Sequence, residues 1–151
     1  FFEATAVSEG RGTAKPFEIF GHPSFPKDMY RFVPVSRDGA KDPKYKDQVC
    51  YGWNVGGTID EVLKKTNNHI RLFYLLQAYR FFHDKNNFFI KPKKLPIQPE
   101  DYGFNKLAGN AELMQQIKEG RSEVEIRKSW QPKLQEFKKI RKKYLLYSDF
   151  E

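Results

Sequence analysis

The sequence predicts an α+β fold in which a small, partly antiparallel sheet packs with several C-terminal helices. Two observations support this prediction. Segments with strand-like alternation lie before residue 60, and apolar residues spaced by three and four positions follow after residue 70. With 151 residues, of which 39% are hydrophobic, the chain has enough apolar material for one core, so we expect a single domain over residues 1–151.

The strand signals are short and interrupted. Glycine and proline recur so often in residues 1–27 that we expect an ordered but turning segment there. Residues Met29–Ser36 contain Tyr, Phe and Val, but Pro34 lacks a backbone donor and favours an edge strand. Residues Val49–Ile59 predict a second strand, in which alternation places on one face Val49, Tyr51, Trp53 and Val55.

The helix signals lie in the second half of the chain. Residues Ile70–Phe82 carry an apolar stripe and predict the best core helix. Prolines make Lys85–Tyr102 extended or looped. Residues Ala111–Glu119 predict a short helix that ends at Gly120, and the capping-box spacing of Ser122 and Glu125 begins the next helix.

The last helical region contains a conflict, because Pro132 interrupts an apolar stripe that runs from Ile126 to Tyr144. We expect two helices joined at Ser129, which as an N-cap would place Pro132 in a first turn. The ending Tyr144–Tyr147 is expected to return as a final strand or a docked tail. The expected core positions are Leu72, Leu75, Leu76, Tyr79, Leu113, Ile117, Ile126, Trp130, Leu134 and Phe137.

The positive charge is concentrated near the end of the chain. The formal net charge is +8, and residues 117–143 hold ten Lys and Arg against four Glu. Such a face is most often a solvated helix face, but it also attracts anionic polymers. One reading is therefore a stand-alone module that binds an anionic polymer through its basic C-terminal helices, with Tyr51 and Trp53 available for stacking. No apolar run approaches the ~20 residues of a membrane span.

The sequence lacks the residue spacings that are typical of most catalytic and metal sites. The three histidines, His22, His69 and His83, lie far apart and match no metal-ligand spacing. Cys50 lies in an apolar, β-rich run, which favours a buried hydrophobe over a nucleophile. The carboxylates form no pair that spacing alone identifies as glycosidase-like. We therefore assign no catalytic residue and no metal site.

The segment "SEGRGT", Ser8 to Thr13, is the most distinctive motif. Its two glycines permit turns with positive φ and can present Arg11 from a loop. A rigidly presented arginine suits bidentate pairing with a carboxylate, and two readings follow. Arg11 either binds a carboxylate of a ligand, or pairs with Glu9 to staple its own turn. A third reading makes this glycine-rich opening a linker of a purely structural domain.

The stretch "FFEATAVSEGRGTAKPFEIFGHP" resembles the opening of the C-terminal domain of exo-acting β-N-acetylmuramidases, a glycoside hydrolase family. The resemblance continues in "VCYGW", "FNKLAGNAELMQQIKEG" and "SWQPKLQEFKKIRKKYLLY". It implies a two-domain enzyme whose N-terminal, Rossmann-like catalytic domain is absent from these residues. It also implies hydrolysis of terminal N-acetylmuramic acid from peptidoglycan fragments, an exported bacterial protein (periplasmic or extracellular), and no cofactor. Membranes and nucleic acid are not expected partners.

The resemblance also implies a role for the opening motif. From the family we transfer only one role to this motif, that of lining the substrate cleft. The residues concerned are Glu3, Thr5, Ser8, Glu9, Arg11 and Thr13. Muramic acid bears a lactyl carboxylate that glucosamine lacks, so Arg11 is the expected source of discrimination. The sequence departs from the family pattern at Ala4 and Ala6, where Gly and Asn are usual, and either change could weaken a contact near Thr5.

Overall fold

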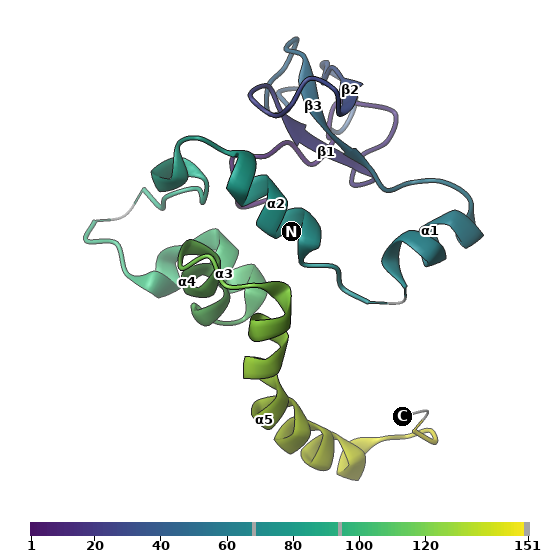
Figure 1. Cartoon of the computed structure of the whole chain (residues 1–151), viewed down its shortest axis with the longest axis vertical. Coiled ribbons are helices and arrows are strands. Elements are labelled where there is room, and N and C mark those ends of the chain that lie inside the picture. The colour runs from purple at the N-terminus through teal and green to yellow at the C-terminus, as the bar shows by residue number, and fades with distance from the viewer. Residues whose placement is uncertain (68, 94, 150–151) are drawn as a thin grey trace.

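The computed structural model describes residues 1–67, 69–93 and 95–149, and it confirms the α+β fold. Three antiparallel strands form one sheet in the order β1-β3-β2, with β1 at Ile19–His22, β2 at Tyr30–Phe32 and β3 at Cys50–Asn54. The helices follow in the sequence, and they lie below the sheet in Figure 1. All three strands of the sheet lie within residues 19–54.

The sheet differs from the sequence prediction at its edges. Strand β1 lies inside the segment expected to be irregular, and β2 stops at Phe32, two residues before Pro34. The central pair Gly21 and Gly52 explains the close approach of β1 and β3. A Cβ atom at position 52 would lie 1.8 Å from the carbonyl oxygen of Phe20, so only glycine allows this spacing.

Five α-helices are described: α1 (Ile59–Thr66), α2 (Phe73–Phe81), α3 (Gly103–Ala108), α4 (Glu112–Lys118) and α5 (Glu123–Arg141). The predictions of α2 and α4 are confirmed, whereas α1 and α3 were not predicted. The hydroxyl of Ser122 and the carboxylate of Glu125 form the expected capping box of α5.

The prediction that two helices meet at Ser129 is wrong. Helix α5 continues through Pro132. The Ser129 hydroxyl does not cap a helix, because it donates to the carbonyl of Ile126 and accepts from the side chain of Gln116. Proline removes the hydrogen bond to the carbonyl of Lys128, and both residues are exposed, so water can solvate that carbonyl.

The core is dominated by aromatic rings. Its main cluster includes Phe2, Phe20, Phe25, Phe82, Phe88, Phe89 and Phe104. Among the expected core positions, Leu72, Leu75, Ile117 and Ile126 are buried, while Leu76, Tyr79 and Leu113 are partly buried against the cluster. Trp53 is partly buried and also packs on this cluster, where its ring contacts those of Phe20, Phe25, Tyr74 and Phe81.

The far end of α5 does not contribute to the core. Leu134 and Phe137 are 39% and 58% exposed, so their assignment to the core is wrong. Trp130 is only half-buried and lies 5.7 Å from the guanidinium of Arg127. Tyr147 is 86% exposed, so the ending is neither a strand nor a docked tail.

Within the described residues, none of the helices combines the length and the apolar character that crossing a membrane would require.

Candidate functional site

The opening segment, residues 1–13, is irregular but tightly held by neighbours on two sides. On one side Ser8 and Gly21 exchange backbone hydrogen bonds of 2.9 and 3.0 Å, which attach the segment to β1. On the other side the amide of Ala6 donates to the carbonyl of Phe88 at 2.7 Å, and the amide of Ile90 donates to the carbonyl of Ala4 at 3.0 Å. The segment therefore lies between the sheet and the chain after α2.

The glycine turn has the geometry that the motif predicts. Gly10 and Gly12 have φ values of +78° and +79°, in the region that favours glycine. The backbone also packs closely here, because a Cβ atom on Gly12 would lie 2.6 Å from the carbonyl oxygen of Val35. The Arg11 side chain between these glycines is 45% exposed, so the turn presents it to solvent.

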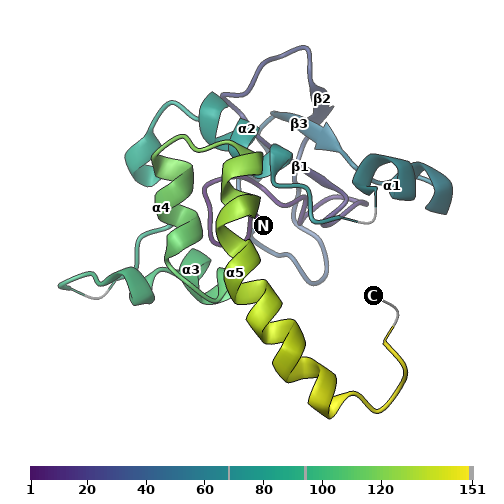
Figure 2. The ribbon, with the colours of Figure 1, turned by 60° about the horizontal axis from the view of Figure 1, so that its bottom comes forward.

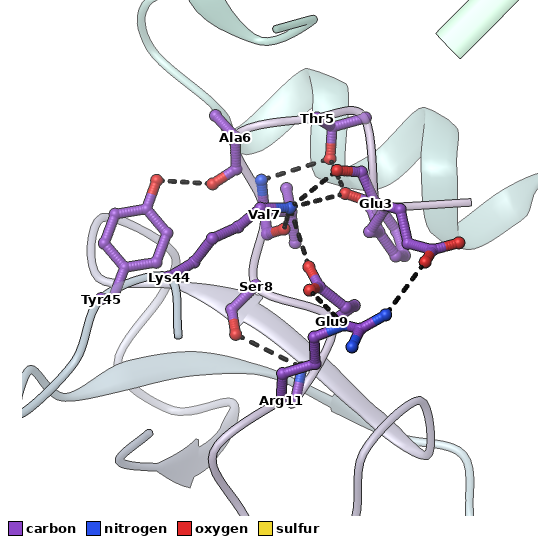
Figure 3. A network of polar contacts seen from close by, with 11 residues as sticks. Glu3, Thr5, Ala6, Val7, Ser8, Glu9, Arg11, Lys44 and Tyr45 are labelled. Atoms are coloured by element: carbon purple, nitrogen blue, oxygen red, sulfur yellow. Dashed lines mark hydrogen bonds and ion pairs between the residues drawn. The ribbon is translucent and has the colours of Figure 1, made fainter. Parts of the chain in front are cut away.

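Arg11 is held by carboxylates of its own chain. Its Nη2 atom donates to Oε1 of Glu3 at 3.3 Å, and its Nε atom lies 3.3 Å from Oε1 of Glu9 (Figure 3). The guanidinium also lies 5.0 Å from the ring centroid of Phe17. Glu9 therefore pairs with Arg11, as expected from the alternative in which this pair stabilises its own turn. Among the described residues, Nη1 of Arg11 has no acceptor.

Lys44 is the centre of this polar network, and sequence reasoning missed it. Its ammonium nitrogen lies within hydrogen-bond distance of four acceptors, which share its three N–H groups: Oε2 of Glu9 (2.8 Å) and the backbone carbonyls of Phe2 (3.0 Å), Glu3 (3.2 Å) and Val7 (3.1 Å) (Figure 3). The bonds span 35 to 42 positions in sequence. A lysine within a polar loop gives no pattern that predicts such contacts.

The three predicted hydroxyl residues shape the turn. The Thr5 hydroxyl donates to the carbonyl of Phe2 and accepts from the amide of Val7. The Ser8 hydroxyl accepts from the amide of Gly10, and the Thr13 hydroxyl donates to the carbonyl of the same glycine. Thr5 and Ser8 are 0% and 1% exposed, so in this structure neither side chain reaches an open surface.

A pocket of about 280 Å³ lies beside the charged network. Its walls are largely apolar and include five aromatic residues, Phe1, Phe2, Phe17, Phe20 and Tyr74. Glu3 and Glu9 also line it, and Arg71 and His69 reach it from the segment before α2. Arg11 contacts three of the lining residues, Glu3, Glu9 and Phe17, and is thereby fixed next to the pocket.

The comparison with protein families decides the identity of the domain. The model described as "Exo-beta-N-acetylmuramidase NamZ, C-terminal" matches residues 1–147. The chain belongs to this family. The match includes the opening segment and α5, so both the candidate site and the basic helix are parts of the family's domain.

Two relatives of this family share most of the domain. The peptidoglycan β-N-acetylmuramidase NamZ of Bacillus subtilis (strain 168) is 29% identical over 96% of this chain. A crystal structure of a DUF1343 family protein from Bacteroides fragilis superposes on 98% of the chain with a TM-score of 0.78 and 37% identity. The chain spans only 35% and 38% of the lengths of these two proteins.

Other reactive side chains are buried or scattered. Burial raises the pKa of the Cys50 thiol to about 12, so it is a protonated core residue at neutral pH, as its apolar surroundings predicted. In the ranges that the structure describes, His, Cys, Asp and Glu form no group of three that could hold a metal ion.

His22 is expected to make the stability of the domain depend on pH. Its ring packs edge-on against Tyr45 and Phe82, and burial lowers its pKa from 6.5 to about 4. Below pH 6.5 the His22 imidazole is protonated in the unfolded chain but stays neutral in the folded chain. The free energy of unfolding is therefore expected to fall as the pH is lowered from 6.5 to 4. Urea titrations at pH 7 and pH 5 should show a smaller difference for His22→Phe than for the wild type.

Proposed function

We propose that this domain forms one wall of the substrate cleft of an exo-acting β-N-acetylmuramidase, whose catalytic carboxylate lies on a preceding domain. One observation carries the proposal: a half-exposed guanidinium, Arg11, is fixed by Glu3 and Glu9 beside an aromatic-lined pocket. The name of the Bacillus relative supports peptidoglycan as the substrate. A domain of this kind is expected to act in the periplasm or outside the cell.

The proposed contact joins Arg11 to the lactyl carboxylate of terminal N-acetylmuramic acid. A preorganised guanidinium loses little conformational entropy when it binds a carboxylate, and the charge-assisted bond discriminates against a sugar without that group. Glu3 and Glu9 orient the guanidinium, while Thr5, Ser8 and Thr13 contribute by shaping the turn. Aromatic walls of the pocket suit the apolar faces of a sugar ring.

The test is an Arg11→Ala variant of the full-length enzyme, assayed on a fragment with terminal N-acetylmuramic acid. Loss of a charge-assisted contact worth about 1.5–3 kcal/mol should lower kcat/KM by roughly 10- to 150-fold. Arg31→Ala is the matched control, because Arg31 is an exposed arginine on edge strand β2 and, among the described residues, forms no ion pair with a residue that lines the pocket, whereas Arg11 pairs with Glu3 and Glu9. Unchanged kcat/KM in the Arg11 variant, with melting equal to the wild type, would exclude the contact.

The alternative, a module that binds an anionic polymer through the basic helices, makes a different prediction. Its affinity would fall steeply as ionic strength rises, because each neutralised charge releases counterions. Recognition of one carboxylate in a cleft depends on salt only weakly. Binding of peptidoglycan fragments measured at 50 and 200 mM salt separates the two functions.

A further inference from the structure

The two halves of α5 have different surroundings. The first half is anchored, because Ile126 is fully buried and Ser129 accepts a hydrogen bond from Gln116 of α4 at 2.9 Å. Every residue from Gln131 to Phe137 is exposed. With about 3.6 residues per turn, this run covers all faces of the helix, so none of these faces is buried against the domain. Lys133 contacts the domain through an exposed ion pair with Glu112 of α4 at 2.8 Å. Figures 1 and 2 both show this half of α5 extending away from the rest of the domain.

The uncovered half carries an apolar stripe, which we call the outer stripe and define as Leu134, Phe137, Ile140 and Tyr144. Their exposed fractions are 39%, 58%, 56% and 77%. Spacings of three place Leu134, Phe137 and Ile140 along one side of α5, and Tyr144 follows in the short 3-10 turn Lys142–Tyr144. An isolated helix in water gains no stability from such a stripe, whereas a helix that packs on a partner is stabilised when the stripe is buried.

The charges around the outer stripe indicate the kind of partner. Residues 131–143 contain six Lys and Arg and one Glu. Two of these charges are paired within the chain, Lys133 with Glu112 and Arg141 with Asp149. In a twofold dimer the same surface meets itself, so pairing of two stripes would still bring an excess of positive charge together. The surface therefore fits a partner that is apolar at its centre and acidic at its margin better than it fits a second copy.

We propose that the outer stripe docks onto the domain that precedes this one in the relatives, on an apolar surface with acidic margins. This inference rests on the two-domain arrangement in the proposed function. The relatives are nearly three times as long as this chain, and the matching family model describes their C-terminal part. The N-terminus lies beside α2 in Figure 1 and beside the anchored half of α5 in Figure 2, so a domain joined at Phe1 starts on the side of the molecule where α5 begins.

Cysteine labelling of the full-length protein tests the docking. Phe137→Cys lies in the outer stripe, and Val124→Cys is the matched control, since Val124 is 76% exposed at the other end of the same helix. Cys50 is buried and gives no background. We expect a maleimide to label position 137 at least tenfold more slowly than position 124. A second variant, Phe137→Glu, should expose amides 131–141 to hydrogen exchange while Val124→Glu leaves them protected.

Each contrary outcome overturns the docking proposal. Equal labelling at positions 137 and 124 shows an uncovered stripe. Protection that disappears on dilution indicates a second copy as the occupant, and protection that needs added dextran sulfate indicates an anionic polymer. The labelling experiment does not depend on sugar recognition, so the two proposals can fail separately. If position 137 is labelled slowly but the Arg11→Ala enzyme keeps its activity, only the proposed substrate contact is rejected. If position 137 is labelled as fast as position 124 but the Arg11→Ala enzyme loses activity, only the docking is rejected.

Discussion

Replacing Phe88 by alanine is expected to lower the free energy of unfolding by about 3–5 kcal/mol, the usual cost of removing a fully buried phenyl ring. Phe88 is 0% exposed, and its ring contacts those of Tyr79, Phe82 and Phe89. Its carbonyl also accepts the amide of Ala6, so loss of packing here loosens the opening segment. Urea unfolding of the domain measures the effect.

Phe73→Ala serves as the control for this variant. Phe73 is 43% exposed at the start of α2, so its truncation should cost less than about 1.5 kcal/mol. Similar costs at positions 73 and 88 would contradict the placement of Phe88 at the centre of the aromatic core.

Replacing Lys44 by methionine is expected to cost about 3 kcal/mol, or roughly 6–12 °C in Tm for a domain of this size. The variant keeps the apolar stem but leaves Glu9, whose side chain is only 10% exposed, without its ammonium partner. Three backbone carbonyls lose a donor as well. The opening segment should then exchange its amide hydrogens faster than β3 does.

Lys41→Met is the control in the same loop. Lys41 pairs with Asp38 at 2.7 Å, but the two side chains are 77% and 101% exposed, so this ion pair should contribute less than about 0.5 kcal/mol. A Lys44 variant as stable as the Lys41 variant would show that the Lys44 contacts of Figure 3 contribute nothing to the stability of the fold.

The sequence predicted the parts of the structure that depend on local patterns. The apolar stripe of α2 and the Ser122–Glu125 capping box are contained within a few residues, and both are confirmed. Pro132 shows the limit of a local rule: its cost inside a helix is real, but it falls on an exposed turn of a helix that is otherwise well capped.

Long-range contacts could not be predicted in this way. Phe88 and Phe89 lie in a stretch that prolines marked as extended, and only the tertiary structure places them in the core. In the candidate site, the pairing of Glu9 with Arg11 was one of the alternatives that the motif left open, and the structure shows this pair. Lys44, which bonds across 35 or more positions, had no signal in the sequence.

Substrate discrimination by the full-length enzyme tests the central claim most directly. The measurement is the ratio of kcat/KM for terminal N-acetylmuramic acid to that for terminal N-acetylglucosamine, in the wild type and in Arg11→Ala. If Arg11 binds the lactyl carboxylate, the substitution lowers this ratio at least tenfold, because only the muramic substrate loses a contact. If both substrates slow equally, or neither slows, Arg11 only staples its own turn and the proposed sugar contact is wrong.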